Sequence, residues 1–212
     1  MTATISLMLL LVAVVTFNTD QAFAKKGDSS SKKKIELCCA WGNALDDGVL
    51  TFSIKNGGSD LAKIVKLAIN DWEKALNGLV KFKHIKDENA DSDIEIEFKK
   101  GKGQKVGKAV TFFDQVGLID HVEISISKKS YGVTLNKPTL EHVAKHEFGH
   151  ALGIGHAEFK NSLMSPNVDE VITKMSACEL ESVKYANSWK FIDEKNSPQP
   201  LDEGNFKCKK DY

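Results

Sequence analysis

The 212-residue chain contains no arginine, so all 29 of its basic residues are lysines. Arginine is the side chain that holds carboxylate and phosphate groups with two parallel hydrogen bonds, and binding of that kind is therefore excluded. The lysines are balanced by 29 aspartates and glutamates, which gives a formal net charge of zero. A chain without excess positive charge lacks the electrostatic signature of nucleic-acid binding, so we expect no nucleic-acid partner.

Long apolar runs are also scarce. The run over residues 5–15 is too short to span a bilayer, which needs about 20 residues. It is followed by Ala22-Phe23-Ala24, the small-x-small pattern of a signal-peptide cleavage site. We therefore predict a signal peptide over residues 1–24 and a secreted, extracellular protein without stable membrane insertion. The alternative is a retained N-terminal anchor, because the first four residues carry no lysine.

Cysteine occurs four times, at Cys38, Cys39, Cys178 and Cys208. In an exported chain, four cysteines indicate two disulfides, for which three connectivities exist. We expect that the adjacent Cys38 and Cys39 do not bond to each other. Cys178 and Cys208 would then be their partners and would join the final helix and the tail to the start of the domain.

The most informative segment is an eleven-residue motif, H-E-x-x-H-x-x-G-x-x-H, which starts at His146. Residues four apart lie on the same face of a helix, so His146 and His150 can reach one metal ion. Gly153 stands where the helix must end, because glycine adopts the left-handed conformation without penalty, and His156 can then return toward the ion. Three imidazoles suit tetrahedral zinc and leave a fourth position open, which indicates a catalytic zinc site.

Glu147 supplies the second half of the predicted chemistry. It follows the first histidine and would project beside the ion. Zinc lowers the pKa of bound water to about 7, and a carboxylate within hydrogen-bond reach can take the proton and deliver it to a leaving amine. The motif therefore predicts peptide-bond hydrolysis with Glu147 as the general base. His142, one helical turn earlier, is expected to be a neighbour of the site and not a ligand.

Residues 162–166, S-L-M-S-P, place a methionine eight residues after His156. With this feature the chain resembles the metzincin metallopeptidases, and the spacing and Met-x-Pro sequence are most similar to the matrixins, the matrix metalloproteinases. The resemblance implies that the three motif histidines bind one catalytic Zn²⁺, that Glu147 is the general base, and that Met164 forms a hydrophobic floor beneath the metal. Ala157, after the third histidine, argues against the astacin-like and reprolysin-like families, which have an acidic residue there.

The resemblance also implies a protein or peptide substrate, bound as an extra strand along the rim of the cleft. Residues 107–112 match the rim strand in order and character, so Ala109 and Val110 are candidate substrate-binding residues; the alternative is an ordinary edge strand. We expect a monomer. The loop that binds structural calcium in matrixins has no clear counterpart, so calcium is an alternative without support. A cysteine that ligates the zinc and keeps the enzyme latent is the alternative to two disulfides.

Periodicity indicates alternating strands and amphipathic helices. Apolar residues recur at helical spacing over residues 61–79. A metal-binding helix opens at Pro138 and Thr139 with Asn136 or Thr139 as its cap, and Ser176-x-x-Glu179 has the capping-box form that starts a final helix through about residue 186. Alternation predicts strands at residues 50–54, 80–85, 94–98, 109–113 and 122–126.

These elements predict an α+β fold. The resemblance implies a metzincin, zincin-like catalytic domain with a five-stranded mixed twisted sheet, an active-site helix and a C-terminal helix. The expected organisation is a disordered leader over residues 25–34, the catalytic domain over residues 35–190, and a polar C-terminal tail over residues 191–212. One alternative function is a catalytically idle zinc-binding or adhesive module, against which Glu147 argues. Another is a zinc hydrolase of non-peptide amides.

Overall fold

A computed structural model describes residues 33–87, 90–101, 103–193, 195–201 and 204–208. The predicted signal peptide and most of the predicted leader lie outside these residues. The largest sheet has the strand order β3-β2-β4-β6-β5, in which β2, β3, β4 and β6 are parallel and β5 runs antiparallel to β6 at one edge. The predicted five-stranded mixed sheet is therefore confirmed. Its strands are β2 (Val49–Lys55), β3 (Lys81–His84), β4 (Ile94–Lys99), β5 (Gly107–Phe113) and β6 (Ile119–Ser127).

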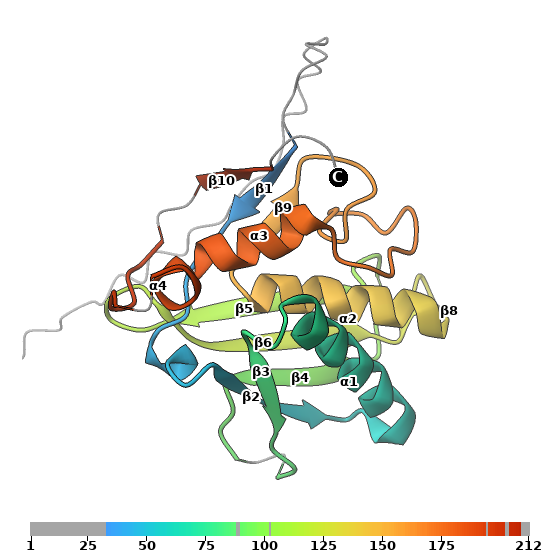
Figure 1. The fold of residues 1–212 in the computed structure, drawn as a ribbon. Helices are drawn as coiled ribbons and strands as arrows, with labels where there is room; N and C mark the ends of the chain where they lie inside the picture. Colours follow the sequence, from blue (N-terminus) through green and yellow to red (C-terminus); the bar gives the residue numbers. More distant parts are fainter. Residues whose placement is uncertain (1–32, 88–89, 102, 194, 202–203, 209–212) are drawn as a thin grey trace, which may run out of the picture. The chain divides into compact units, whose positions relative to one another are not determined.

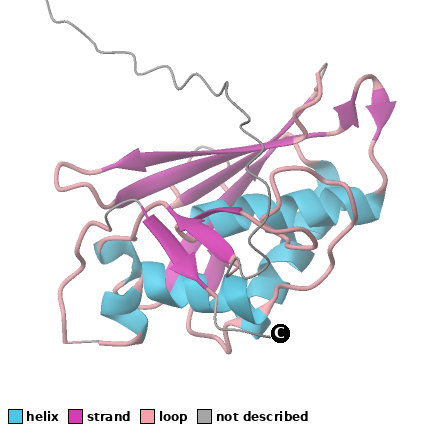
Figure 2. Ribbon diagram, turned by 90° about the horizontal axis from the view of Figure 1, so that it is seen from above, coloured by secondary structure: helices cyan, strands magenta, loops and turns pink. Residues whose placement is uncertain are grey.

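Two long helices, α1 (Gly58–Ala75) and α2 (Lys137–Ala151), lie on one face of this sheet (Figures 1 and 2). They contact each other, and α2 also contacts β5 and β6. The predicted C-terminal helix is α3 (Ala177–Ala186), and the described residues also form α4 (Ser188–Phe191) and a short 3-10 helix, η1 (Asn43–Leu45). Within the part of the chain that the structure describes, no helix is long and apolar enough to span a membrane.

The core fills the space between the sheet and the two long helices. The alternating side chains Ile94, Ile96 and Phe98 of β4 are buried, as a strand with one inward face requires. The facing helix α1 contributes Trp72, which is fully buried and donates its indole N–H to the backbone oxygen of Lys145 at 3.0 Å. This hydrogen bond ties α1 to the part of α2 that carries the histidine motif.

Two smaller sheets complete the structure. The first has the order β10-β1-β9, with β1 (Lys34–Leu37) paired antiparallel to both β9 (Ile154–Ala157) and β10 (Gly204–Lys207). The second is a hairpin of β7 (Lys129–Ser130) and β8 (Val133–Thr134). The sequence did not predict either sheet. The strand β10 lies in the predicted polar tail, which therefore contributes a strand beside β1.

The predicted cysteine pairing is wrong. The disulfides join Cys38 to Cys39 and Cys178 to Cys208. Cys208 donates its N–H to the backbone oxygen of Lys33 at 2.9 Å, so it lies at the opposite end of β1 from Cys38. Lys33 and Cys38 are five residue steps apart along the strand, a span of roughly 17 Å at about 3.3 Å per step. A bond between Cys208 and either early cysteine would need the strand pairing to break.

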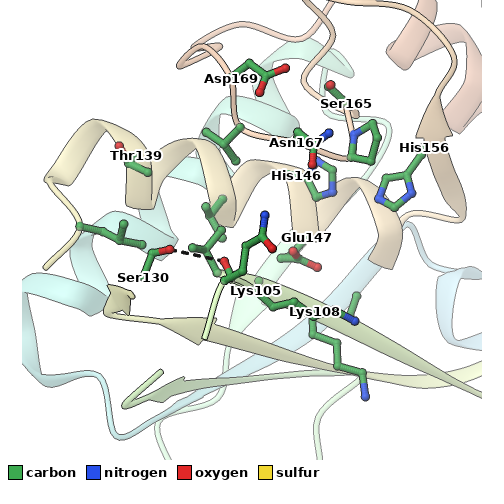
Figure 3. A pocket seen from close by; sticks show the side chains of 18 of the residues that line it. Lys105, Lys108, Ser130, Thr139, His146, Glu147, His156, Ser165, Asn167 and Asp169 are labelled. Atoms are coloured by element: carbon green, nitrogen blue, oxygen red, sulfur yellow. Dashed lines mark hydrogen bonds between the residues drawn. The ribbon is translucent and has the colours of Figure 1, made fainter. Parts of the chain in front are cut away.

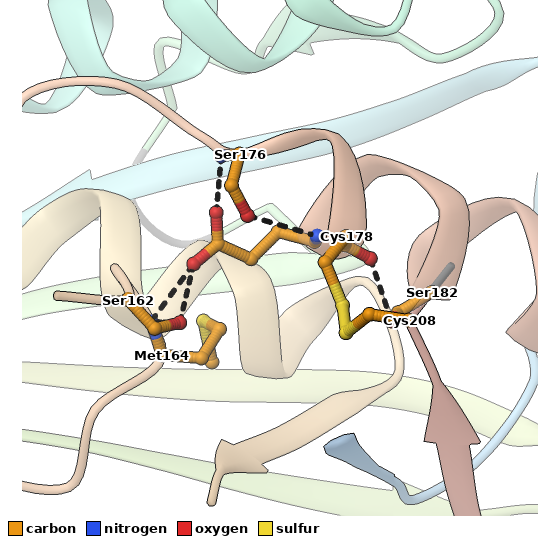
Figure 4. The surroundings of a disulfide bond; sticks show 7 residues. Ser162, Met164, Ser176, Cys178, Ser182 and Cys208 are labelled. Carbon is orange, nitrogen blue, oxygen red and sulfur yellow. Dashed lines mark hydrogen bonds between the residues drawn. A yellow bond between two sulfur atoms is a disulfide. The ribbon is translucent and has the colours of Figure 1, made fainter. Parts of the chain in front are cut away.

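A backbone bend at the end of β1 explains why the two adjacent cysteines meet. The N–H groups of Cys38 and Cys39 both donate to the carbonyl oxygen of Gly153, at 3.0 and 3.4 Å, so the backbone bends here. The first turn of α3 places Cys178 against Cys208 (Figure 4). All four cysteines are described and none is free, so the alternative of a cysteine that ligates a metal is not what the structure shows.

Candidate metal centre

The helix α2 begins and ends at residues whose chemistry fixes its length. The Asn136 side chain accepts hydrogen bonds from the backbone N–H and the hydroxyl of Thr139, at 2.9 and 2.8 Å, so Asn136 is the cap. At the other end, Gly153 has a φ of +93°. A Cβ at this position would meet the backbone oxygen of Cys39, so glycine is required both for the turn and for the close approach.

The turn at Gly153 brings three imidazoles together. His146 and His150 lie one turn apart on α2, and His156 returns on β9. One ring nitrogen from each lies within 4.8 Å of the other two. His146, Glu147 and His156 face the same cleft in Figure 3. The structure therefore assembles the residues that the sequence pattern selected.

Backbone carbonyl groups determine which ring nitrogens face the centre. The Nδ1 atoms of His146 and His150 lie 2.7 Å from the oxygen of Leu163 and 2.9 Å from that of Ile154. A carbonyl oxygen can only accept, so each Nδ1 carries the proton and each Nε2 presents a lone pair. These two Nε2 atoms are 3.0 Å apart. Two facing lone pairs repel unless a cation lies between them, so the arrangement fits a metal ion and does not form a hydrogen bond.

The protonation of the three rings agrees with this fit. Burial lowers the pKa of His146 to about 3 and that of His150 to about 4. Burial also lowers the pKa of His156, against the opposing effect of Glu36. Because metal ligation requires neutral imidazole, rings that stay neutral well below pH 7 are suitable ligands. Three nitrogen donors with one open side suit Zn²⁺.

Glu147 lies next to the three histidines but is held apart from them. The side chain is 5% exposed, and its Oε2 atom has no hydrogen-bond partner among the described residues. Burial raises the pKa of Glu147 to about 8, while a hydrogen bond from the Ala109 backbone acts in the opposite direction. Burial alone favours the neutral acid, whereas a cation held by the three histidines would favour the carboxylate, so this group can both take and deliver a proton.

The strand β5 approaches Glu147 closely only because residue 107 is glycine. A Cβ there would lie 2.7 Å from Cδ of Glu147 and 2.9 Å from Cγ1 of Val143, well inside ordinary contact distance. Gly107 was part of the predicted strand, but its role was not foreseen. Glycine in a strand can indicate a close approach of another group, and that signal was present in the sequence.

The outer edge of β5 forms one side of the cleft. Ser127 donates its N–H to Val106, so every second residue from Val106 exchanges hydrogen bonds with β6. Ala109 lies between these residues, directs its backbone groups away from β6, and lines the cleft. Val110 pairs with Glu123 of β6 and is not part of the cleft lining. The structure thus brings Ala109 to the site and leaves Val110 beside it.

The cleft has a volume of about 990 Å³. Its floor is the face of α2 with Thr139, Val143 and the motif residues, and one side is the beginning of β5. The other side is an irregular segment after Met164, from which Ser165, Asn167 and Asp169 are seen in Figure 3.

Met164 is fully buried beneath the motif helix. A Cβ on Gly149 would meet the sulfur and methyl group of Met164, so the second variable position of the motif must be glycine for the methionine to fit. The carbonyl of Met164 accepts the N–H of Ala157 at 2.8 Å, next to His156. Residues 162–165, here called the methionine turn, therefore hold the first ligand through Leu163 and the third through Ala157.

A buried carboxylate fixes that turn to α3. Glu179 is fully buried and accepts hydrogen bonds from the Ser162 hydroxyl, at 2.5 Å, and from the Met164 N–H, at 3.4 Å. Its other oxygen accepts the Ser176 N–H in the predicted capping box (Figure 4). The capping box was visible in the sequence, whereas the contact of Glu179 with the methionine turn was not.

Comparison with protein families identifies this arrangement. The family model for matrixin matches residues 41–184, which is most of the chain and includes the whole motif and the methionine turn. A comparison with curated protein sequences found no match. With the fold and the three-histidine centre already established, the match shows that the chain belongs to the matrixin family of zinc metallopeptidases.

Proposed function

We propose that this protein is a secreted zinc-dependent endopeptidase with one catalytic Zn²⁺ on His146, His150 and His156 and with Glu147 as its general base. The observation that carries the proposal is the pair of Nε2 lone pairs held 3.0 Å apart by backbone carbonyls, beside a buried carboxyl group. An adhesive module would have no use for a carboxyl group buried beside the three histidines, with one oxygen left without a partner among the described residues.

The chain's own residues account for positioning and proton transfer. Zn²⁺ bound by the three imidazoles supplies Lewis-acid polarisation of the carbonyl and a lowered pKa for water. Glu147 takes a proton from the attacking water and passes it to the nitrogen of the leaving amine, so the carboxylate is regenerated at the end. The position of its Oε2 atom, buried and without a protein partner among the described residues, is consistent with this role.

The outer edge of β5 is the proposed binding site for the substrate backbone. Backbone groups of alternate residues point away from β6 and can pair with an extended peptide. Ala109 contributes its C=O group, because its N–H donates to Glu147. Main-chain pairing accepts many sequences, so selectivity then rests on side chains in the rest of the cleft. This arrangement favours peptide bonds over small amides as substrates, because a small amide cannot use the edge.

The test is cleavage of a mixed quenched-fluorescent peptide library by the zinc-loaded protein. Glu147→Ala and a chelated sample should both lose cleavage, while Glu147→Ala should still bind zinc. Glu141→Ala is the matched control, because Glu141 lies on the same helix, pairs with Lys137 at 3.5 Å and does not line the cleft. A zinc-loaded wild-type protein that cleaves no peptide would contradict the proposal and favour the idle module.

Secretion is tested separately. The full-length chain is expressed in a secreting host, and the N-terminus of the product is sequenced. Protein in the medium that begins at Lys25 supports the proposed signal peptide. Protein that stays with the membrane fraction and keeps residues 1–24 would support an N-terminal anchor instead.

A further inference from the structure

The side of the cleft opposite β5 is built from residues 165–175, here called the wall loop. The wall loop contains no helix or strand, and six of its residues line the cleft. Figure 3 shows Ser165, Asn167 and Asp169 of the loop across the cleft from Lys105. Whatever fixes the wall loop therefore fixes the width of the cleft.

Beyond Ser165, whose N–H donates to Ser162 at 3.1 Å, hydrogen bonds from the described residues hold the wall loop at two points. In the described part of the chain, no backbone–backbone hydrogen bond involves residues 166–175. The N–H of Ile172 donates to Nδ1 of His142 at 2.8 Å, and Nζ of Lys145 donates to the carbonyl oxygen of Thr173 at 2.8 Å. Ile172 and Met175 add apolar contacts with the core.

Both anchors are buried polar side chains of α2. His142 is 1% exposed and Lys145 is 4% exposed. The ammonium group of Lys145 also lies 2.6 Å from Oδ2 of Asp71 on α1, so one side chain joins α1, α2 and the wall loop. Buried polar groups of this kind are costly without partners, which makes their contacts specific. A leucine at either position would fill the space but could not hold the loop.

The anchors also stand at a fixed distance from the metal centre along the helix. His142 is one turn before His146, and Lys145 immediately precedes it. Because a helix is rigid over one turn, the wall loop is held in register with the zinc ligands. Displacement of the loop would move Val168 and Val171, which line the cleft and are 37% and 41% exposed, relative to the reacting bond.

We infer that His142 and Lys145 are positioning residues that set the width of the cleft between α2 and the wall loop. They thereby select which substrate side chain is accepted beside the scissile bond. The inference rests on the proposed function, because only an endopeptidase has a scissile bond. The width of the cleft is nevertheless tested by the affinities of ligands that are not cleaved. A pocket with fixed walls discriminates between side chains that differ by a few methylene groups, and a pocket with a loose wall does not.

The probes are three zinc-binding peptide hydroxamates that differ only in one side chain, alanine, leucine or phenylalanine. Their dissociation constants are measured with the zinc-loaded wild type, His142→Leu, Lys145→Met and His142→Asn. Asparagine can place an acceptor where Nδ1 of His142 stands. Lys137→Met is the matched control, since Lys137 is an exposed lysine of the same helix that does not line the cleft. Hydrogen–deuterium exchange of residues 165–175 is followed in parallel.

We expect His142→Leu and Lys145→Met to speed exchange of the Ile172 amide, the wall-loop N–H that donates to His142, by about tenfold or more. The ratio between the strongest and weakest hydroxamate should shrink by about threefold or more. His142→Asn should restore part of both effects, and Lys137→Met should change neither. A variant that fails to fold is replaced by the other anchor's variant, since each anchor alone makes the same prediction.

Faster exchange with an unchanged affinity ratio would overturn the inference, as would unchanged exchange. Failure of every hydroxamate to bind the zinc-loaded wild type would overturn it as well. If hydroxamates bind selectively but no peptide is cleaved, the proposed endopeptidase function fails while the role of the two anchors is still decided by the affinity ratios.

Discussion

Gly107→Ala should disable the site by adding one methyl group. The backbone of Gly107 does not adopt a positive φ, so alanine is compatible with the strand itself. The new Cβ would lie 2.7 Å from Cδ of Glu147 and 2.9 Å from Cγ1 of Val143, whereas carbon atoms rest at about 3.5–4.0 Å. Either the Glu147 carboxyl or β5 must move by about 1 Å. Because α2 is tied to α1 through Trp72, the helix cannot simply recede.

A displacement of this size has a predictable cost. Misplacement by about 1 Å costs on the order of 100-fold in rate, which corresponds to about 2.7 kcal/mol of transition-state stabilisation. Overpacking should also lower the free energy of unfolding by about 1–3 kcal/mol. We therefore expect a roughly 100-fold lower kcat/KM, mainly in kcat, with zinc stoichiometry unchanged, since none of the three histidines is touched.

The assay is steady-state cleavage of the best library peptide, with zinc content and urea unfolding measured on the same samples. Gly103→Ala is the matched control, because it lies four residues earlier and a Cβ there meets nothing within 4 Å. It should behave as the wild type in all three measurements. If Gly107→Ala keeps a kcat/KM within about threefold of the wild type, the reasoning that β5 positions Glu147 by direct contact is refuted.

Three further outcomes follow from the buried polar groups and the disulfides. Glu179→Ala removes the acceptor for two hydrogen bonds of the methionine turn. The free energy of unfolding, measured in urea, should fall by about 3 kcal/mol. An unchanged value would mean that water replaces the carboxylate. For metal-free protein, the lowered pKa values of His146 and His150 mean that the unfolded chain binds more protons on these rings below about pH 6.5, whereas the raised pKa of Glu147 means that the folded chain binds one more proton between about pH 8 and 4.5. The two histidines outweigh the single carboxyl group, so the free energy of unfolding should fall as pH drops from about 6.5 to 4, and a flat profile would contradict the burial of neutral rings. Cys178→Ser should lower the free energy of unfolding by roughly 3–4 kcal/mol. Proteolytic mapping of the unreduced wild type should release a peptide in which Cys178 is joined to Cys208 and to no other cysteine.

Periodicity alone predicted the strands of the large sheet well, whereas their assembly into one mixed sheet was implied by the family resemblance. The alternation of residues 94–98 corresponds to buried and partly exposed positions along β4. The helix predicted over residues 61–79 is observed at Gly58–Ala75. Apolar spacing extended the prediction too far, because Leu76 is buried after the helix has ended. The stop was present in Asn77 and Gly78, which adopt positive φ values of 54° and 71°.

Elements that depend on distant partners were not predictable. The strand β1 is four residues long and exists because β9 and β10, more than a hundred residues away, pair with both of its edges. Nothing within residues 34–37 carries that information. The error in cysteine pairing has the same origin, because only the register of β10 on β1 shows that Cys208 lies by Lys33 and out of reach of Cys38.

The candidate site was likewise predictable where it depends on local sequence and unpredictable where it depends on distant contacts. The spacing of the histidines follows from helix geometry and was read directly from the sequence. The proton on each Nδ1 atom, by contrast, is set by the carbonyls of Leu163 and Ile154, and the position of the carboxyl group of Glu147 is set by the absence of a side chain at residue 107. These are tertiary contacts between segments whose own sequences are unremarkable.

The helix α2 shows why this division arises. Nearly every residue from His142 to Gly149 is buried, because β5 and β6 cover one side of the helix, α1 another, and the wall loop and methionine turn a third. Along this stretch the only open face of the helix is the floor of the cleft, so there is no polar solvent-facing stripe and hydrophobic periodicity does not predict the helix. Three of its polar residues meet dedicated partners: Ile172 for His142, Asp71 and Thr173 for Lys145, and Leu163 for His146. Nε2 of His142 and Oε2 of Glu147 have none among the described residues. We conclude that the buried polar residues of α2 link the metal centre to the walls of the cleft, so substitutions at His142 and Lys145 should change selectivity before they change the chemistry.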